Sequence, residues 1–160
     1  MRLLPLLIFA LLLSTLLMQR QNILSMQPTA SSEQINSAAT MFLQYRSAVM
    51  AYMSANPTFT GVIPASTLTG IYGQQFSAAF TASTGNAVTA VGSGRQMTVY
   101  AALPTGALNT VLQLSGNDAS IGLSAGTTWT SQATGVVATA QPLAVAVPAK
   151  DVVSVFEIGN

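Results

Sequence analysis

The sequence predicts an α+β protein: an N-terminal transmembrane helix, then a helix packed on a small, mainly antiparallel sheet with one further helix. Three observations predict this class. Residues 3–18 are apolar and uncharged, residues 35–53 repeat apolar side chains at helical period, and short β-type runs separated by Gly and Pro follow from residue 86. We expect an anchor at 1–20, a linker at 21–32 and an extracytoplasmic domain at 33–160, with its helix at 33–56 and its sheet region at 86–160.

The apolar stretch at residues 3–18 predicts the membrane anchor. As a helix it would rise about 24 Å, against a hydrocarbon core of about 30 Å. Gln19 and the long side chains of Arg2 and Arg20 can make up the difference. The side chains expected in lipid are Leu3, Leu6, Leu7, Ile8, Phe9, Leu11, Leu12, Leu13, Leu16 and Leu17. By the positive-inside rule, the amino terminus is expected in the cytoplasm and the rest outside it.

Other fates of this stretch fit the sequence less well. A cleaved signal peptide needs small residues near its end, where Arg20 and Gln21 stand. A lipoprotein needs a cysteine, and the chain has none. A prepilin needs a glycine just ahead of the apolar stretch, and the first glycine is Gly61. An uncleaved single-pass anchor is therefore the expectation.

The composition excludes several functions. Only 6% of the residues are charged and the formal net charge is +1, so the chain is not expected to bind nucleic acid. It contains no Cys and no His, which argues against a transition-metal site and against ordinary general-base catalysis near neutral pH. We expect neither a metal nor a cofactor, and no enzymatic activity.

The first soluble helix is predicted from Ser31 and Gln34, which form a capping-box pattern, to the stop at Asn56-Pro57. Its apolar face is Ile35, Ala38, Ala39, Phe42, Val49, Met50 and Met53. The face fits core packing, and a contact with another subunit is the alternative.

The middle of the chain predicts a hairpin. Residues 58–70 are expected to be a loop with a short extended piece, and residues 71–80 carry no clear pattern. The strands are expected at 86–91 and 96–101, joined by the turn at 92–94.

A helix is expected from Leu103-Pro104 to Gly116, with Leu108, Val111, Leu112 and Leu114 buried. A strand is expected at 136–140 and a break at Gln141-Pro142. The clearest strand is 152–158, with Val153, Val155 and Glu157 on one face and Val152, Phe156 and Ile158 on the other. Because both faces are apolar, it should be central or covered on both sides.

Few residues suggest chemistry. Asp118 and Asp151 could serve as an acid and base pair, although both fit turn positions better. Lys150, the sole lysine, could activate a serine as in a periplasmic Ser/Lys hydrolase, although Pro148 and Ala149 before it and Asp151 after it fit a surface turn. Arg46 is expected to pair with Glu33 or to reach the sheet.

The candidate partner contacts are Tyr45, Arg46, Tyr52 and Trp129. The single tryptophan, Trp129, lies in a Gly- and Thr-rich stretch, where it is either a core residue or an exposed anchor for a partner.

Several segments together resemble one family. They are residues 41–56 (MFLQYRSAVMAYMSAN), 57–64 (PTFTGVIP), 96–101 (QMTVYA) and the closing VVSVFEIG. The chain is similar to the PilM family of type IVb (thin) pilus systems of conjugative plasmids and integrative elements. The helix motif Tyr-Arg-x-Ala-Val-x-x-Tyr of that family is matched by Tyr45, Arg46, Ala48, Val49 and Tyr52.

This resemblance implies an inner-membrane protein with a periplasmic domain that takes part in pilin export or in the basal body of the pilus. The implied partners are the membrane and other pilus-machine proteins: the inner-membrane platform, the pilin and the secretin complex. No catalytic residues carry over. Self-association of the chain stays open, and so does a pilin-like subunit that enters the filament itself.

Overall fold

The structure, a computed structural model, describes residues 32–72 and 75–159 of the 160-residue chain. Residues 35–160 belong to one compact unit. Within the described ranges, no helix is both long and apolar enough to cross a membrane. The expected anchor at 1–20 and nearly all of the linker at 21–32 lie outside these ranges, so both stay predictions from sequence.

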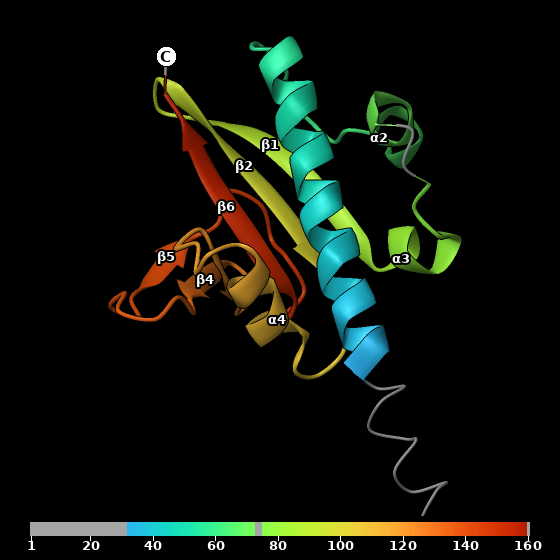
Figure 1. The fold of residues 1–160 in the computed structure, drawn as a ribbon. Coiled ribbons are helices and arrows are strands. Elements are labelled where there is room, and N and C mark those ends of the chain that lie inside the picture. Colours follow the sequence, from blue (N-terminus) through green and yellow to red (C-terminus); the bar gives the residue numbers. More distant parts are fainter. Residues whose placement is uncertain (1–31, 73–74, 160) are drawn as a thin grey trace, which may run out of the picture. The chain divides into compact units, whose positions relative to one another are not determined.

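A six-stranded sheet carries the fold (Figure 1). All its strand pairs are antiparallel, in the order β1-β2-β6-β3-β4-β5. The strands are β1 (Thr84–Val91), β2 (Gly94–Ala101), β3 (Ile121–Ser124), β4 (Thr128–Ser131), β5 (Ala140–Pro142) and β6 (Val152–Ile158). The expected antiparallel sheet covered by a helix is therefore confirmed.

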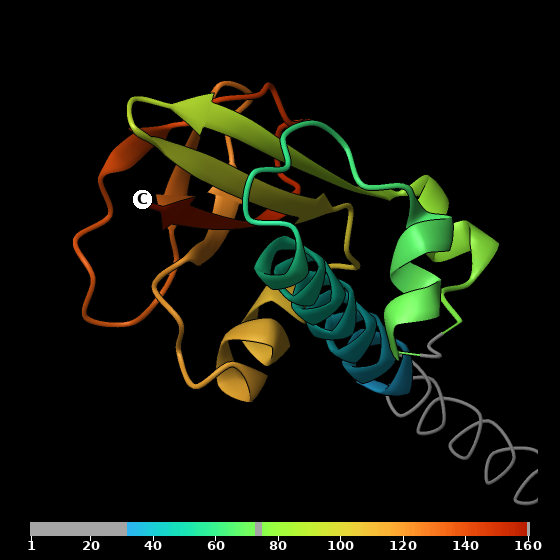
Figure 2. The ribbon, with the colours of Figure 1, turned by 90° about the horizontal axis from the view of Figure 1, so that it is seen from above.

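The long helix, helical over residues 32–55, packs across one face of this sheet (Figure 2). The prediction of a helix at 33–56 is confirmed to within one residue at each end. The helix buries Ala39, Phe42, Tyr45, Ala48, Val49 and Met53. Met50 was predicted on this face and is 40% exposed, because it stands at the margin of the stripe.

Strand β6 lies in the interior of the sheet and has two apolar faces, as predicted. Val152 packs in the cluster under the long helix, with Phe156 and Ile158 beside it. Val153 and Val155 belong to a second cluster on the opposite face, with Trp129 and Val147. The chain segment before β6 therefore covers the face that the helix leaves open.

The predicted hairpin is confirmed, with β1 and β2 joined by Gly92 and Ser93. Gly92 adopts a φ of 57°, which a two-residue turn of this kind requires and glycine adopts without strain. Ahead of it, the expected loop at 58–70 is wrong in part. Residues Ala65–Tyr72 form the helix α2, and Ala78–Ala82 form the short α3, capped by the Ser77 hydroxyl. Thr67, Thr69 and Gly70 of α2 have low helix propensity, so the sequence pattern did not predict this helix.

The next helix, α4, spans Ala107–Leu114 and ends before Gly116, as expected. It starts three residues after Pro104, whose carbonyl accepts a hydrogen bond from the Ala107 amide (3.0 Å). Val111 and Leu112 are buried and Leu108 is partly buried, as predicted, but Leu114 is exposed. Leu114 is two residues after Leu112 and therefore lies on another side of α4 from Leu108 and Leu112.

In the segment between β3 and β6, the structure differs from the sequence-based predictions. The strand expected at 136–140 is an exposed loop over residues 136–139, and Ala140 and the break expected at Gln141-Pro142 form β5. Gln141 pairs with Trp129 of β4, a strand that the sequence analysis did not predict. Strands this short are defined by their partners rather than by their own residue pattern.

Candidate functional site

Arg46 connects the long helix to the sheet. Its guanidinium forms an ion pair with Asp118, and Nη2 donates to the Ser120 hydroxyl at 3.3 Å. The guanidinium carbon lies 4.5 Å from the ring centroid of Phe156 on β6, a cation–π contact. Of the two sequence-based alternatives, the one in which Arg46 reaches the sheet is correct. Among the described residues its acidic partner is Asp118 and not Glu33.

This environment sets the charge state of Asp118. Burial by itself would raise the pKa of the carboxyl, but hydrogen bonds from the Ser120 amide (2.9 Å) and from Arg46 outweigh it, so the pKa lies below its usual value. The Arg46 side chain is 11% exposed and that of Asp118 is 28% exposed. The pair is thus largely shielded from water, and the Asp118 carboxyl is ionised at neutral pH.

The two aspartates do not form an acid and base pair. Asp118 lies ahead of Ile121, where β3 begins, whereas Asp151 lies beside Ser124, where β3 ends, because the Asp151 carbonyl accepts the Ser124 amide at 3.0 Å. The carboxylate of Asp151 has no hydrogen bond or ion pair with any described residue. Burial raises its pKa. The two groups therefore flank opposite ends of one strand.

Lys150 occupies the exposed turn before β6 with a φ of 75°. Its amide donates to the Ser124 carbonyl (2.8 Å), and its ammonium group has no partner in the described part of the chain. A lysine that activates a serine must be desolvated. The exposed position of Lys150 does not provide this.

Tyr45 belongs to a buried polar network. Its hydroxyl accepts a hydrogen bond from the side-chain amide of Asn86 on β1 (2.7 Å). The same Asn86 amide bonds both the N–H and the C=O of Ile63, each at 2.8 Å, while Gly61 pairs with Val88 in both directions at 2.8 Å. The Asn86 side chain thus extends the short run of hydrogen bonds that joins residues 61–63 to the outer edge of β1. Burial raises the pKa of the Tyr45 hydroxyl, which stays neutral.

The other candidate partner contacts lie in different surroundings. Trp129 is 4% exposed, so the structure has it as a core residue, and its buried indole N–H has no partner among the described residues. Tyr52 is half-buried and meets the Phe59 ring edge-on, with centroids 5.2 Å apart. Tyr45, Arg46 and Trp129 are therefore largely inaccessible, and Tyr52 is partly covered.

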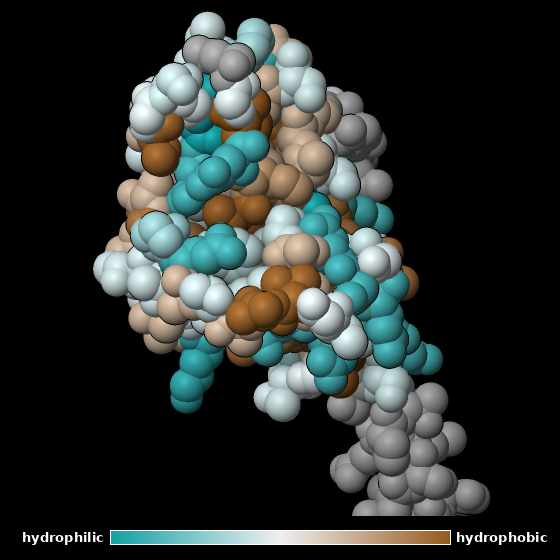
Figure 3. Space-filling view, turned by 90° about the vertical axis from the view of Figure 1, so that its left-hand side faces the viewer, coloured by the Kyte–Doolittle hydropathy of each residue, from teal (hydrophilic) through white to brown (hydrophobic). Residues whose placement is uncertain are grey.

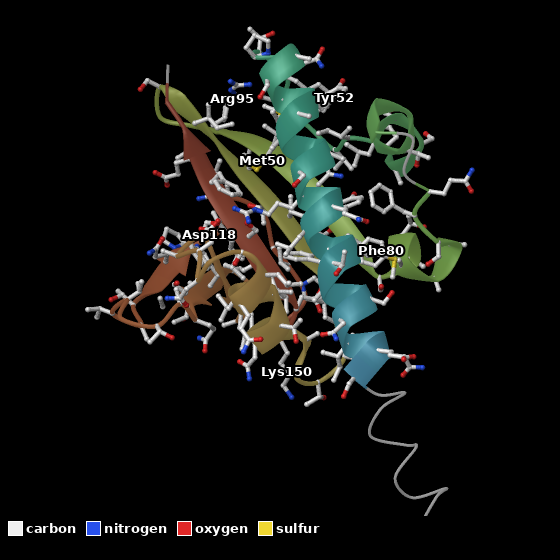
Figure 4. All side chains as sticks on the ribbon, viewed as in Figure 1. Met50, Tyr52, Phe80, Arg95, Asp118 and Lys150 are labelled. Atoms are coloured by element: carbon white, nitrogen blue, oxygen red, sulfur yellow. The ribbon has the colours of Figure 1, made fainter. Side chains whose placement is uncertain are left out.

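A groove runs between the end of the long helix and the paired ends of β2 and β6. It has a volume of about 290 Å³ and is lined by Met50, Met53, Ser54, Pro57, Arg95, Met97, Phe156, Glu157 and Ile158. Figure 4 shows Met50 and Arg95 on the sheet side of the long helix, with Tyr52 on the other side. The sequence analysis did not identify this groove, because three segments far apart in the chain build it.

A second cavity, of about 470 Å³, lies at the end of α4. It is lined by Asn109, Leu112, Gln113, Gly116, Asn117, Gln132 and Thr134. Asn117 is already engaged, because its amide exchanges hydrogen bonds of 2.9 and 3.0 Å with the Thr134 backbone. The cavity holds no charged group. Among the described residues, no three acidic or other ligating side chains gather to hold a metal ion.

These features define a class of protein: a mixed α and β domain in which a long helix lies on a six-stranded antiparallel sheet and a methionine-lined groove opens beside them. Within that class, the chain belongs to the PilM family, whose family model matches residues 8–155. The chain is also similar in fold to the crystal structure of a PilM protein from Escherichia coli B7A. The TM-score is 0.51 at 14% identity, over 79% of this chain and 94% of that chain. No curated protein sequence matches the chain.

Proposed function

We propose that this protein is a non-catalytic, inner-membrane-anchored component of a type IVb pilus assembly or pilin-export apparatus, and that its periplasmic domain holds other machine parts. The observation that carries the proposal is membership of the PilM family over residues 8–155, which supports a role in a pilus system. The match includes most of the apolar stretch at residues 3–18, from which the anchor is inferred.

The described domain supports a role in binding other proteins rather than in catalysis. Arg46 and Asp118, its best-connected charges, neutralise each other and fasten the helix to the sheet. The accessible concave surface beside them is lined mainly by methionine, aromatic and aliphatic side chains. Such a surface suits protein contacts, since methionine adapts its shape to a partner.

The anchor is tested by the mass and the fractionation of the mature protein. We expect the full-length mass, and a polypeptide that stays with membranes through carbonate extraction. Leu12→Arg should weaken insertion by about 2.5–3.5 kcal/mol or more, whereas Asn22→Arg, with the same added charge outside the stretch, should not. A full-length protein found in the soluble fraction would refute the anchor.

The pilus role is tested by purifying complexes through a tag on the full chain from detergent-solubilised membranes. The expected result is recovery of the pilin, the platform protein or the secretin complex. If none of them is recovered, the pilus role is rejected.

A pilin-like subunit is the second candidate. It is favoured by an apolar N-terminal stretch that leads into a long helix lying on an antiparallel sheet. In that case the protein should appear in sheared pili with residues 1–18 removed. Its absence from pili would leave the first proposal.

A further inference from the structure

The groove beside the long helix continues into two neighbouring hollows. It shares Met50 and Ser54 with a neighbouring hollow over the exposed side of the helix, lined by Ser47, Met50, Ala51, Ser54 and Ala55. It shares Arg95, Glu157 and Ile158 with another hollow at the tip of the β1–β2 hairpin. The three together form one trough, which we call the methionine trough.

The lining of the methionine trough suits a helix. Met50, Met53 and Met97 have unbranched side chains that fit irregular apolar surfaces. Beside them the long helix presents only Ser and Ala, so the backbone of a second helix can approach closely. Apolar side chains at positions i, i+3 or i+4 and i+7 of such a helix would contact the methionines.

The charged side chains that line the trough are Arg95 and Glu157. Cross-strand partners share a face of a sheet, so Arg95, which pairs with Ile158, lies on the face under the long helix. Glu157 alternates to the other face. Nη1 of Arg95 donates to the Phe59 carbonyl at 3.3 Å, and the other guanidinium donors bond no described residue.

No acidic group among residues 35–159 forms an ion pair with Arg95, although Glu157 lines the same groove. Arg46 and Asp118 are paired, and Asp151 and Lys150 lie at the opposite end of β6. In a chain with 6% charged residues, an unpaired guanidinium at an apolar trough is a specific complement for a carboxylate.

We propose that the methionine trough receives a helix of a partner protein that carries an apolar face and, beside it, an acidic side chain that Arg95 binds. The inference rests on the proposed scaffolding role and names the chemistry of the partner. The Phe156 ring, which makes the cation–π contact with Arg46, forms part of the surface on which that helix lies.

The test uses three fluorescent 18-residue helical probes with one shared leucine face. They differ in two neighbouring positions, which are Glu, Gln or Lys. Binding to the purified full-length chain in nanodiscs is followed by anisotropy, with empty nanodiscs as the control. The Glu probe should bind about fivefold more tightly than the Gln probe, as expected for one partly exposed charged hydrogen bond. The Lys probe should bind most weakly.

Variants then locate the contact. Arg95→Glu should invert the order, so that the Lys probe binds best, while Lys150→Glu, with the same charge change at the other end of β6, should preserve it. Met50→Glu should weaken the Glu and Gln probes, because it places a negative charge among the methionines. If Arg95→Glu does not fold, Arg95→Gln should remove the difference between the Glu and Lys probes.

Three outcomes would overturn the proposal. The probes bind with no dependence on charge, or Lys150→Glu acts as strongly as Arg95→Glu, or no probe binds and Met50→Glu dissociates a dimer seen by sedimentation. The last result would mean that a second copy covers the trough. Because the probes are synthetic, their binding does not depend on recovery of pilus-machine proteins, so the two proposals fail separately.

Discussion

Replacing Asn86 with alanine should destabilise the domain severely. The change leaves three buried groups without partners: the N–H and the C=O of Ile63 and the hydroxyl of Tyr45, which now bond Asn86 at 2.7–2.8 Å. Each such group costs about 1–3 kcal/mol, so the loss should be at least about 3 kcal/mol. A domain of this size has a total stability of about 5–15 kcal/mol.

The assay is urea unfolding of the full-length chain, followed by fluorescence of the single tryptophan, Trp129, which is buried in the core. Tyr45→Phe is the matched control. It keeps both bonds between Asn86 and Ile63 and leaves one buried Asn86 N–H without its acceptor, so it should cost about 1–3 kcal/mol, less than the loss of all three bonds. If Asn86→Ala costs no more than Tyr45→Phe, the side chain does not hold the 61–63 segment and the reasoning is refuted.

Three further changes test other parts of the domain in the same urea assay. The lowered pKa of Asp118 means that its contribution is present above the ordinary aspartate pKa and is lost as the pH falls through the folded-state pKa. Asp118→Asn should therefore lower the unfolding midpoint at pH 7 but not in strong acid; an equal drop at both would contradict the ion pair with Arg46. Asp151 has a raised pKa, so its ionisation favours unfolding as the pH rises through the folded-state value. Asp151→Asn should raise the midpoint at pH 7, and a lower midpoint would show that the carboxylate has a partner. Gly122→Ala should cost about 1–3 kcal/mol, because the added Cβ would overlap the Thr130 carbonyl oxygen; a neutral result would mean that β3 and β4 can separate without cost.

The sequence predicted the elements whose pattern is local. The long helix follows from its 3.6-residue stripe, the hairpin from Gly92 to Gly94 between two β-type runs, and the interior position of β6 from its two apolar faces. It did not predict β4 or β5, since Trp129 and Gln141 form strands only by pairing with each other.

The candidate site was harder to predict because its contacts are long-range. Arg46 and Asp118 are 72 residues apart in the chain, and either of two partners was open to the arginine. The methionine trough joins the end of the long helix to Arg95 and to Phe156, and no short motif links these segments. The anchor and the periplasmic location stay predictions.

The outer edges of β1 and β5, the two outermost strands of the sheet, differ in how their backbone groups are covered. Along β1, Gly61 occupies the outer backbone groups of Val88, whereas beyond β5 no described strand follows. On the face that carries β5, hydrophobic residues stand exposed among polar ones (Figure 3), and Val137 is 84% exposed. A strand added by another polypeptide along β1 would therefore meet Gly61 at Val88, whereas along β5 the described residues leave an opening. That opening is three residues long and ends at Pro142, whose missing N–H keeps any strand exchange there short.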